Sequence, residues 1–183
     1  MELHTLLQDR SLKQKAKTEK LSQFLLGKKV SIEDLISYAK NAGDIYKATC
    51  IEALEYATKQ DPSVVTEKCF LFVTKALIDK APRTKWEAAK VIGNVAHLFP
   101  AKLDIAINNL LANSEDKGTV VRWATAFALG EILKLRTKRN KELLPAIEAI
   151  CNREEDNGIK KKYIEAIKKA TETKIPRKND SNP

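Results

Sequence analysis

The chain has 183 residues, of which 43% are hydrophobic, with only six glycines and six prolines. This length and composition predict one compact domain or one solenoid rich in helix, and argue against a loop-rich β protein. No run of 18 apolar residues occurs, and the first 20 residues lack a hydrophobic block followed by a small-residue cleavage site. We therefore expect neither a membrane-spanning helix nor a signal peptide, and a cytoplasmic location.

The formal net charge is +9, and the excess of basic residues lies at the two ends of the chain. Residues 1–40 carry a net charge of +3 and residues 159–183 carry +5, whereas the residues between them carry +1. A basic excess attracts polyanions, but it also keeps a helical protein soluble. The charge pattern therefore leaves two interpretations open, a polyanion-binding surface and a solvated surface.

Glycine, proline and capping signals divide the chain into helices. We expect a first helix over residues 11–26, which Gly27 ends, and a second over residues 31–41, which Ser31 opens with a near capping box. Asp61 and Pro62 are expected to open a later helix as its N-cap and first residue. The helices after residue 41 are expected over residues 44–59, 61–79, 83–99, 100–113, 119–135, 140–152 and 157–171, with a mobile polar tail after them.

A short pattern recurs four times at nearly constant spacing. The basic residues Lys47, Lys85, Arg122 and Lys160 follow one another at intervals of 38, 37 and 38 residues. A period in this range marks stacked two-helix units, each too small to bury its apolar face alone. A polar or acidic residue lies six positions before each basic one, so we expect a ladder of contacts that ties each repeat to the next: Asn41, Asp79, Asp116 and Glu154.

These residues resemble HEAT repeats, in which an Asp near the end of the first helix is followed by a Val-Arg pair and an Ala…Leu-Gly stretch in the second. Residues 116–130 match the whole pattern, and residues 79–93 match it with Lys85 in place of the arginine. The outer copies are weaker, because Glu55 and Lys168 stand where the pattern has glycine.

The resemblance implies an all-α fold, a right-handed α-solenoid of about four HEAT-like helix pairs with an N-terminal capping helix. The pairs would span residues 31–60, 61–99, 100–136 and 137–172. Residues 1–30 would form the cap, and residues 173–183 a polar basic tail.

Few residues of this chain are suited to catalysis or metal binding. Cys50, Cys69 and Cys151 are far apart among apolar neighbours, which favours buried thiols in a reducing compartment. The two histidines, His4 and His97, do not form a pair at metal-ligand spacing, and no glycine-rich phosphate loop occurs. We therefore assign no catalytic residue, metal or cofactor, and expect that the protein is not an enzyme.

In HEAT-like solenoids the second helix of each pair lines the concave face, so one row of residues is a candidate binding groove. Trp86 and Trp123 occupy the same place in adjacent repeats and are expected to lie side by side. They either contribute apolar contact to a partner or pack between the repeats. Mixed charge along the row favours a protein or peptide partner. The row comprises Glu52, Tyr56, Trp86, Lys90, Asn94, Trp123, Phe127, Glu131, Glu165 and Lys169.

A second hypothesis is nucleic-acid binding, and a third is a subunit role in a larger assembly. Helical repeats, basic charge and tryptophans also resemble the DNA glycosylases that remove alkylated bases. Their signature places a Trp a few residues before an essential Asp, whereas Trp86 is followed by Glu87, and we find no convincing equivalent. Binding to the phosphate backbone is then expected through a basic loop: Lys134, Arg136, Lys138, Arg139 and Lys141.

Overall fold

The computed structural model describes residues 3–172, which form ten α-helices and three single 3₁₀ turns without a strand. The tail expected over residues 173–183 lies outside the described residues. In chain order the helices are α1 (Leu3–Gln8), α2 (Gln14–Leu26), α3 (Ile32–Asn41), α4 (Asp44–Gln60), α5 (Glu67–Ala76), α6 (Pro82–Val95), α7 (Leu103–Asn113), α8 (Thr119–Lys134), α9 (Asn140–Arg153) and α10 (Asn157–Thr171).

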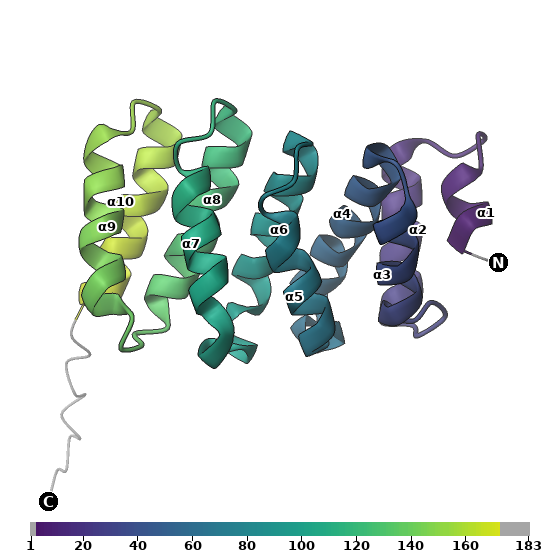
Figure 1. The fold of residues 1–183 in the computed structure, drawn as a ribbon, viewed down its shortest axis with the longest axis horizontal. Helices are drawn as coiled ribbons and strands as arrows, with labels where there is room; N and C mark the ends of the chain where they lie inside the picture. The colour runs from purple at the N-terminus through teal and green to yellow at the C-terminus, as the bar shows by residue number, and fades with distance from the viewer. Residues whose placement is uncertain (1–2, 173–183) are drawn as a thin grey trace, which may run out of the picture.

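The helices lie in two layers and form an elongated stack (Figure 1). In what we call the second layer, α2, α4, α6, α8 and α10 pack on one another in that order. The first layer consists of α3, α5, α7 and α9, each of which packs on the next helix of the chain. This arrangement is the predicted all-α solenoid, in which each helix pair buries its apolar face against its neighbours. None of the described helices is both long and apolar enough to span a membrane.

Two glycines inside helices allow adjacent second-layer helices to approach closely. A Cβ atom added to Gly93 on α6 would lie 2.5 Å from the ring of Phe127 on α8. One added to Gly130 on α8 would lie 2.9 Å from the Cβ of Ala166 on α10. Glycine in a helix interior costs about 1 kcal/mol relative to alanine, and here the close packing offsets that cost.

The predicted ladder is present at all three junctions between consecutive repeats. Lys47, Lys85 and Arg122 each pair with the acid of the next repeat, and that acid also accepts a hydrogen bond from a backbone N–H in its own turn. Asn41 does not take part, because it lies in the first repeat and no basic residue of the pattern precedes it; its amide donates to the carbonyl of Ser37 at 3.0 Å. The three pairs are Lys47 with Asp79, Lys85 with Asp116 at 2.8 Å, and Arg122 with Glu154 at 3.0 Å.

Two local predictions were incomplete. The segment expected as a single cap helix contains a second, shorter helix, α1, before α2. Asp61 and Pro62 open only a 3₁₀ turn over Pro62–Val64, because the Asp61 carboxylate accepts the N–H of Ser63 and closes a tight turn. After extended Val65, the hydroxyl of Thr66 caps α5.

The three cysteines are buried and free, as expected. Burial raises the pKa of the Cys50 and Cys69 thiols to about 12, so both stay protonated and unreactive near neutral pH.

Candidate functional site: the outer face of the second layer

All ten residues of the predicted row lie on second-layer helices, and each is at least partly exposed. They come from α4, α6, α8 and α10, which stack in that order, so together they form one continuous surface. We call this surface the second-layer face. Its two halves, one on α4 and α6 and the other on α8 and α10, differ in how their side chains are bound.

On α6, Trp86 is held in place by the buried carboxylate of Glu87. Its indole Nε1 donates to Oε1 of Glu87 at 2.7 Å, and Nζ of Lys90 donates to Oε2 of the same carboxylate at 2.8 Å. Glu87 is only 3% exposed. The tryptophan, carboxylate and ammonium groups therefore form one connected unit on a single helix.

A second carboxylate, Glu55 on α4, is fully buried beneath this unit. Nζ of Lys59 lies 2.6 Å from Oε1 of Glu55, and Nζ of Lys90 lies 3.6 Å from Oε2. Burial lowers the pKa of Lys90, but Glu87, Glu55 and Glu52 act in the opposite direction and leave it above its usual 10.5. Lys90 is thus a shared cation that offsets the desolvation of two buried acids.

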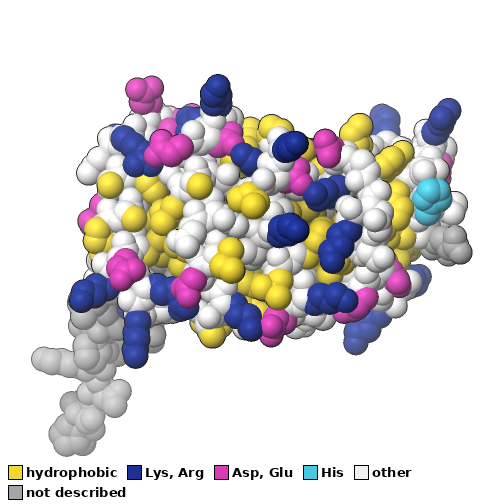
Figure 2. All heavy atoms as spheres, viewed as in Figure 1, with side chains coloured by type: hydrophobic (Ala, Val, Ile, Leu, Met, Phe, Trp, Pro, Cys, Tyr) yellow, Lys and Arg dark blue, Asp and Glu magenta, His cyan; other side chains and the backbone are white. Residues whose placement is uncertain are grey.

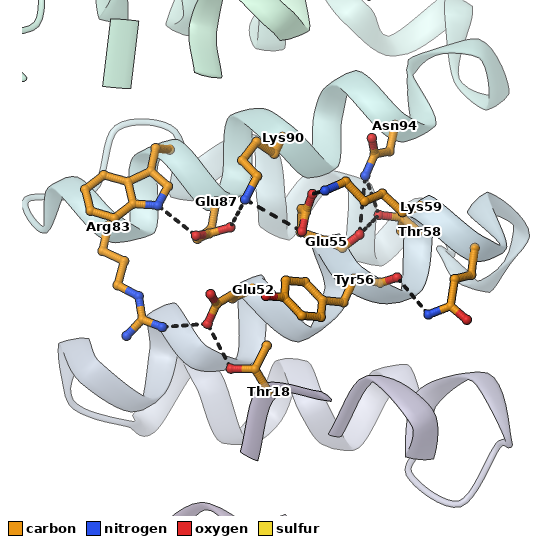
Figure 3. Close-up of polar contacts among 12 residues, drawn as sticks. Thr18, Glu52, Glu55, Tyr56, Thr58, Lys59, Arg83, Glu87, Lys90 and Asn94 are labelled. Atoms are coloured by element: carbon orange, nitrogen blue, oxygen red, sulfur yellow. Dashed lines mark hydrogen bonds and ion pairs between the residues drawn. The ribbon is translucent and has the colours of Figure 1, made fainter. Parts of the chain in front are cut away.

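Glu52 and Asn94, in the same α4–α6 half, also have partners in the chain. Oε2 of Glu52 accepts from the hydroxyl of Thr18 at 2.8 Å and from Nη2 of Arg83 at 2.6 Å, which links α2, α4 and α6 (Figure 3). Asn94 donates to the hydroxyl of Thr58 at 3.0 Å. Beside them, burial and the charges of Glu52 and Glu55 raise the pKa of the Tyr56 phenol, which stays neutral.

The α8–α10 half instead presents an exposed aromatic pair. Trp123 is 38% exposed and stacks on Phe127 with 6.4 Å between ring centroids and 11° between ring planes. Nζ of Lys162 on α10 lies 5.4 Å from the centre of the Trp123 ring, a cation–π arrangement. A hollow of about 170 Å³ lies beside the pair, lined in part by Phe127, Glu131, Lys134, Lys162, Glu165 and Lys169.

Two of the five charged residues around this hollow, Glu165 and Lys169, are free to meet a ligand. Glu131 pairs with Lys134. Glu165 and Lys169 are exposed, and their side chains enter no ion pair among residues 3–172. The α8–α10 half thus combines apolar surface with charges of both signs.

The two tryptophans therefore differ, although they occupy equivalent places in their repeats. Trp86 is half-buried against the core and its N–H is bonded to Glu87, whereas Trp123 is exposed and contacts Phe127. Sequence reasoning missed Glu55 and Glu87 as buried acids. A signal for Glu55 was present, since it stands at the glycine position of the repeat and Lys59 follows four residues later.

The predicted basic loop is partly engaged in structural contacts. Arg136 has a left-handed backbone, with a φ of 53°, and its guanidinium donates to the carbonyls of Lys169 and Glu172, both at 2.7 Å, at the end of α10. Arg139 pairs with Asp104 and donates to the carbonyl of Pro100 at 2.8 Å. Of the five loop residues, only Lys138 and Lys141 are exposed without a charged or carbonyl partner in the described chain.

Within residues 3–172, no group of three or more His, Cys, Asp or Glu side chains is placed to hold a metal ion. Glu52, Glu55 and Glu87 are paired with ammonium, guanidinium, indole and hydroxyl groups.

Comparison by sequence finds no matching family model and no matching curated protein. Comparison by structure finds similar folds. The complex of CpcE and CpcF of phycocyanin lyase from Nostoc sp. PCC7120 contains a chain with a TM-score of 0.69 and 18% identity, matched over 90% of this chain and 96% of that one.

Designed repeat proteins also have similar folds. A computationally designed armadillo repeat protein for modular peptide recognition has a TM-score of 0.70 and 14% identity, over 91% of this chain and 80% of that one. A designed armadillo repeat protein in complex with the peptide (KR)4 has a TM-score of 0.62 and 17% identity, over 90% and 85%. At these identities the likeness establishes the fold, and the chain is an α-helical solenoid of the HEAT and armadillo type.

Proposed function

We propose that the protein is a non-catalytic scaffold that binds a peptide or protein segment on the second-layer face, with the Trp123–Phe127 pair as the anchor. The observation that carries this proposal is the exposure of a stacked aromatic pair beside a hollow with unpaired charges. Large aromatic side chains that bury on binding contribute most of the affinity at many interfaces. Glu165 and Lys169 at the rim would then select the partner by charge.

The α4–α6 half has a supporting role in this proposal. Because Glu52, Glu55 and Glu87 are in ion pairs within the chain, they give a ligand little to pair with, and the pairs from Glu52 to Arg83 and from Glu55 to Lys90 link α4 to α6. A rigid support lowers the ordering cost of binding at the neighbouring anchor. A designed armadillo repeat protein of similar fold is described with the peptide (KR)4, so a solenoid of this kind is able to hold a peptide.

Nucleic-acid binding through the basic loop is the less favoured alternative. Arg136 and Arg139 would have to leave the carbonyls and the carboxylate that they already contact before they could bind phosphate. Lys138 and Lys141 alone offer few phosphate contacts, and the affinity would fall steeply with salt.

The test is a selection of peptides that bind the intact protein from a displayed random library, followed by fluorescence anisotropy of the enriched peptides at physiological salt. Trp123→Ala should weaken binding by at least about tenfold, because it removes the exposed anchor. Ile105→Ala is the matched control, since Ile105 is a 64% exposed apolar residue on first-layer helix α7. Equal affinity of the Trp123→Ala variant and the wild type would refute the proposal.

A further inference from the structure

A second hollow lies on the other side of the molecule, where α3 ends, α4 begins and α5 runs alongside. It has a volume of about 690 Å³ and is lined by basic and apolar residues, with Lys40, Lys75 and Lys80 beside Phe72, Ala76 and Ile78. We call it the basic groove. None of these six residues belongs to the second-layer face.

Large apolar side chains are exposed in and beside the basic groove. Ile78 is 62% exposed, and Leu71, on the preceding part of α5, is 49% exposed. Phe72 and Ala76 are more deeply placed and form an apolar floor. Leu71 and Lys75 are four residues apart on α5, which places them on one side of the helix, and Ile78 lies in the turn that follows. Grouped exposed apolar side chains of this size mark interaction sites in soluble proteins.

The charge around the basic groove is one-sided. Lys47 and Asp79 also line it, but they neutralise one another as part of the ladder. This leaves three lysines against one acid, Asp44. Lys40, Lys75 and Lys80 are exposed and form no ion pair with any of residues 3–172. Figure 2 shows lysine and arginine side chains gathered over the part of this face where α3 and α5 lie, with hydrophobic side chains between them.

We propose that the basic groove binds an acidic amphipathic helix of a partner protein. Apolar side chains of that helix would fill the floor over Phe72 and Ala76 and cover Ile78, while its acidic side chains would meet Lys40, Lys75 and Lys80. This is the pattern of helix-in-groove recognition, in which apolar contact supplies affinity and flanking charge supplies orientation. A nucleic-acid backbone would satisfy the lysines but leave Leu71 and Ile78 without apolar contact. A lipid surface fits poorly because the apolar floor is recessed below the lysines.

The probe for this proposal is a fluorescein-labelled peptide of about 18 residues, long enough to form a helix when bound. Within each stretch of eight residues, this peptide carries leucine at positions i, i+3, i+4 and i+7 and glutamate at most other positions. Three comparison probes are a peptide with the same leucines and lysine for glutamate, a DNA duplex, and vesicles that contain phosphatidylserine. Binding of each to the full chain is measured by anisotropy or co-sedimentation at physiological salt.

The double variant Lys75→Glu, Lys80→Glu should weaken binding of the acidic peptide by about tenfold or more, because it replaces attraction with repulsion. The matched control is the double variant Lys138→Glu, Lys141→Glu. Both of its sites are exposed and distant in sequence from the basic groove, and it gives the same change of net charge. Ile78→Ser, at an exposed site, tests the apolar contact without any change of charge and should also weaken binding. Trp123→Ala should leave this binding unchanged, which separates the basic groove from the second-layer face.

Preferential binding of the acidic peptide, lost in the two groove variants and kept in the control, would support the proposal. An equal loss in both double variants would show that net charge alone attracts the peptide and would overturn it. Binding of DNA or vesicles that depends on Lys75 and Lys80, without peptide binding, would assign the basic groove to a different class of ligand and equally overturn it. Thermal unfolding followed by circular dichroism checks that each variant is folded.

Discussion

The α4–α6 and α8–α10 halves of the second-layer face use the same repeat positions in opposite ways. The position after the basic residue holds Trp86 in one half, bonded to a buried carboxylate, and Trp123 in the other, exposed over Phe127. Eight positions after the basic residue, α4 has the buried acid Glu55, where α8 has Gly130. The comparison teaches that a repeat position fixes where a side chain lies, while its neighbours decide whether it supports the fold or remains available to a partner.

The largest expected difference in stability between the halves comes from replacing one lysine in each. Lys90→Met should lower the free energy of unfolding by about 3 kcal/mol, because it leaves two buried carboxylates without their shared cation. Lys169→Met, in the other half, should change it by less than about 0.5 kcal/mol, since Lys169 is exposed. Urea unfolding at pH 7 measures the free energy of unfolding of both variants. Similar losses for the two variants would mean that the network on α4 and α6 does not stabilise the protein as its geometry indicates.

A smaller effect is expected from the tryptophans. Trp86→Ala should cost about 2–3 kcal/mol of stability, because it removes a half-buried ring and leaves an oxygen of Glu87 without its indole donor. Trp123→Ala should cost less than about 1 kcal/mol, because its ring is already partly in water. The same unfolding measurement compares them. A larger loss of stability for Trp123→Ala than for Trp86→Ala would show that the Trp123–Phe127 pair is part of the core. It would then reverse the comparison between the two halves.

The smallest effect should be equal in both halves, because both contain the ladder. Asp79→Asn and Glu154→Gln should each cost about 1 kcal/mol at pH 7. Burial opposes ionisation of these acids, but hydrogen bonds from Lys47 and Arg122 and from the backbone hold the pKa of Asp79 below 3.8 and that of Glu154 below 4.5.

The lowered pKa values predict a pH dependence with a definite sign. The stability from each acid is complete above its unfolded pKa and is lost as the pH falls through the lower folded value. The difference between wild type and each variant should therefore shrink below about pH 4 in urea unfolding curves. Glu148→Gln, at an exposed site, is the control and should show no such difference. A pH-independent difference would exclude the ion pairs as its cause.

The fold could be predicted because its signals are local and repeated. The period of the basic residues, the acids six residues earlier and the glycines at close approaches each reflect contact between consecutive units. The site could be predicted only in outline. Which tryptophan is exposed depends on contacts between helices, such as Lys90 with Glu55, and no pattern within one repeat reports them. Helix α1 was missed because six residues are too short to show a helical period.

The ladder also sets the order in which the solenoid opens. The α5–α6 and α7–α8 pairs each hold two of its ion pairs, one to each neighbour, whereas the α3–α4 and α9–α10 pairs each hold one. Release of an outer helix pair thus breaks one ion pair of the ladder, and release of an inner helix pair breaks two. Amide hydrogen exchange should therefore be fastest toward the ends of the stack and slowest on α6 and α8. The aromatic pair on α8 would then keep its shape while the terminal helices open and close beside it.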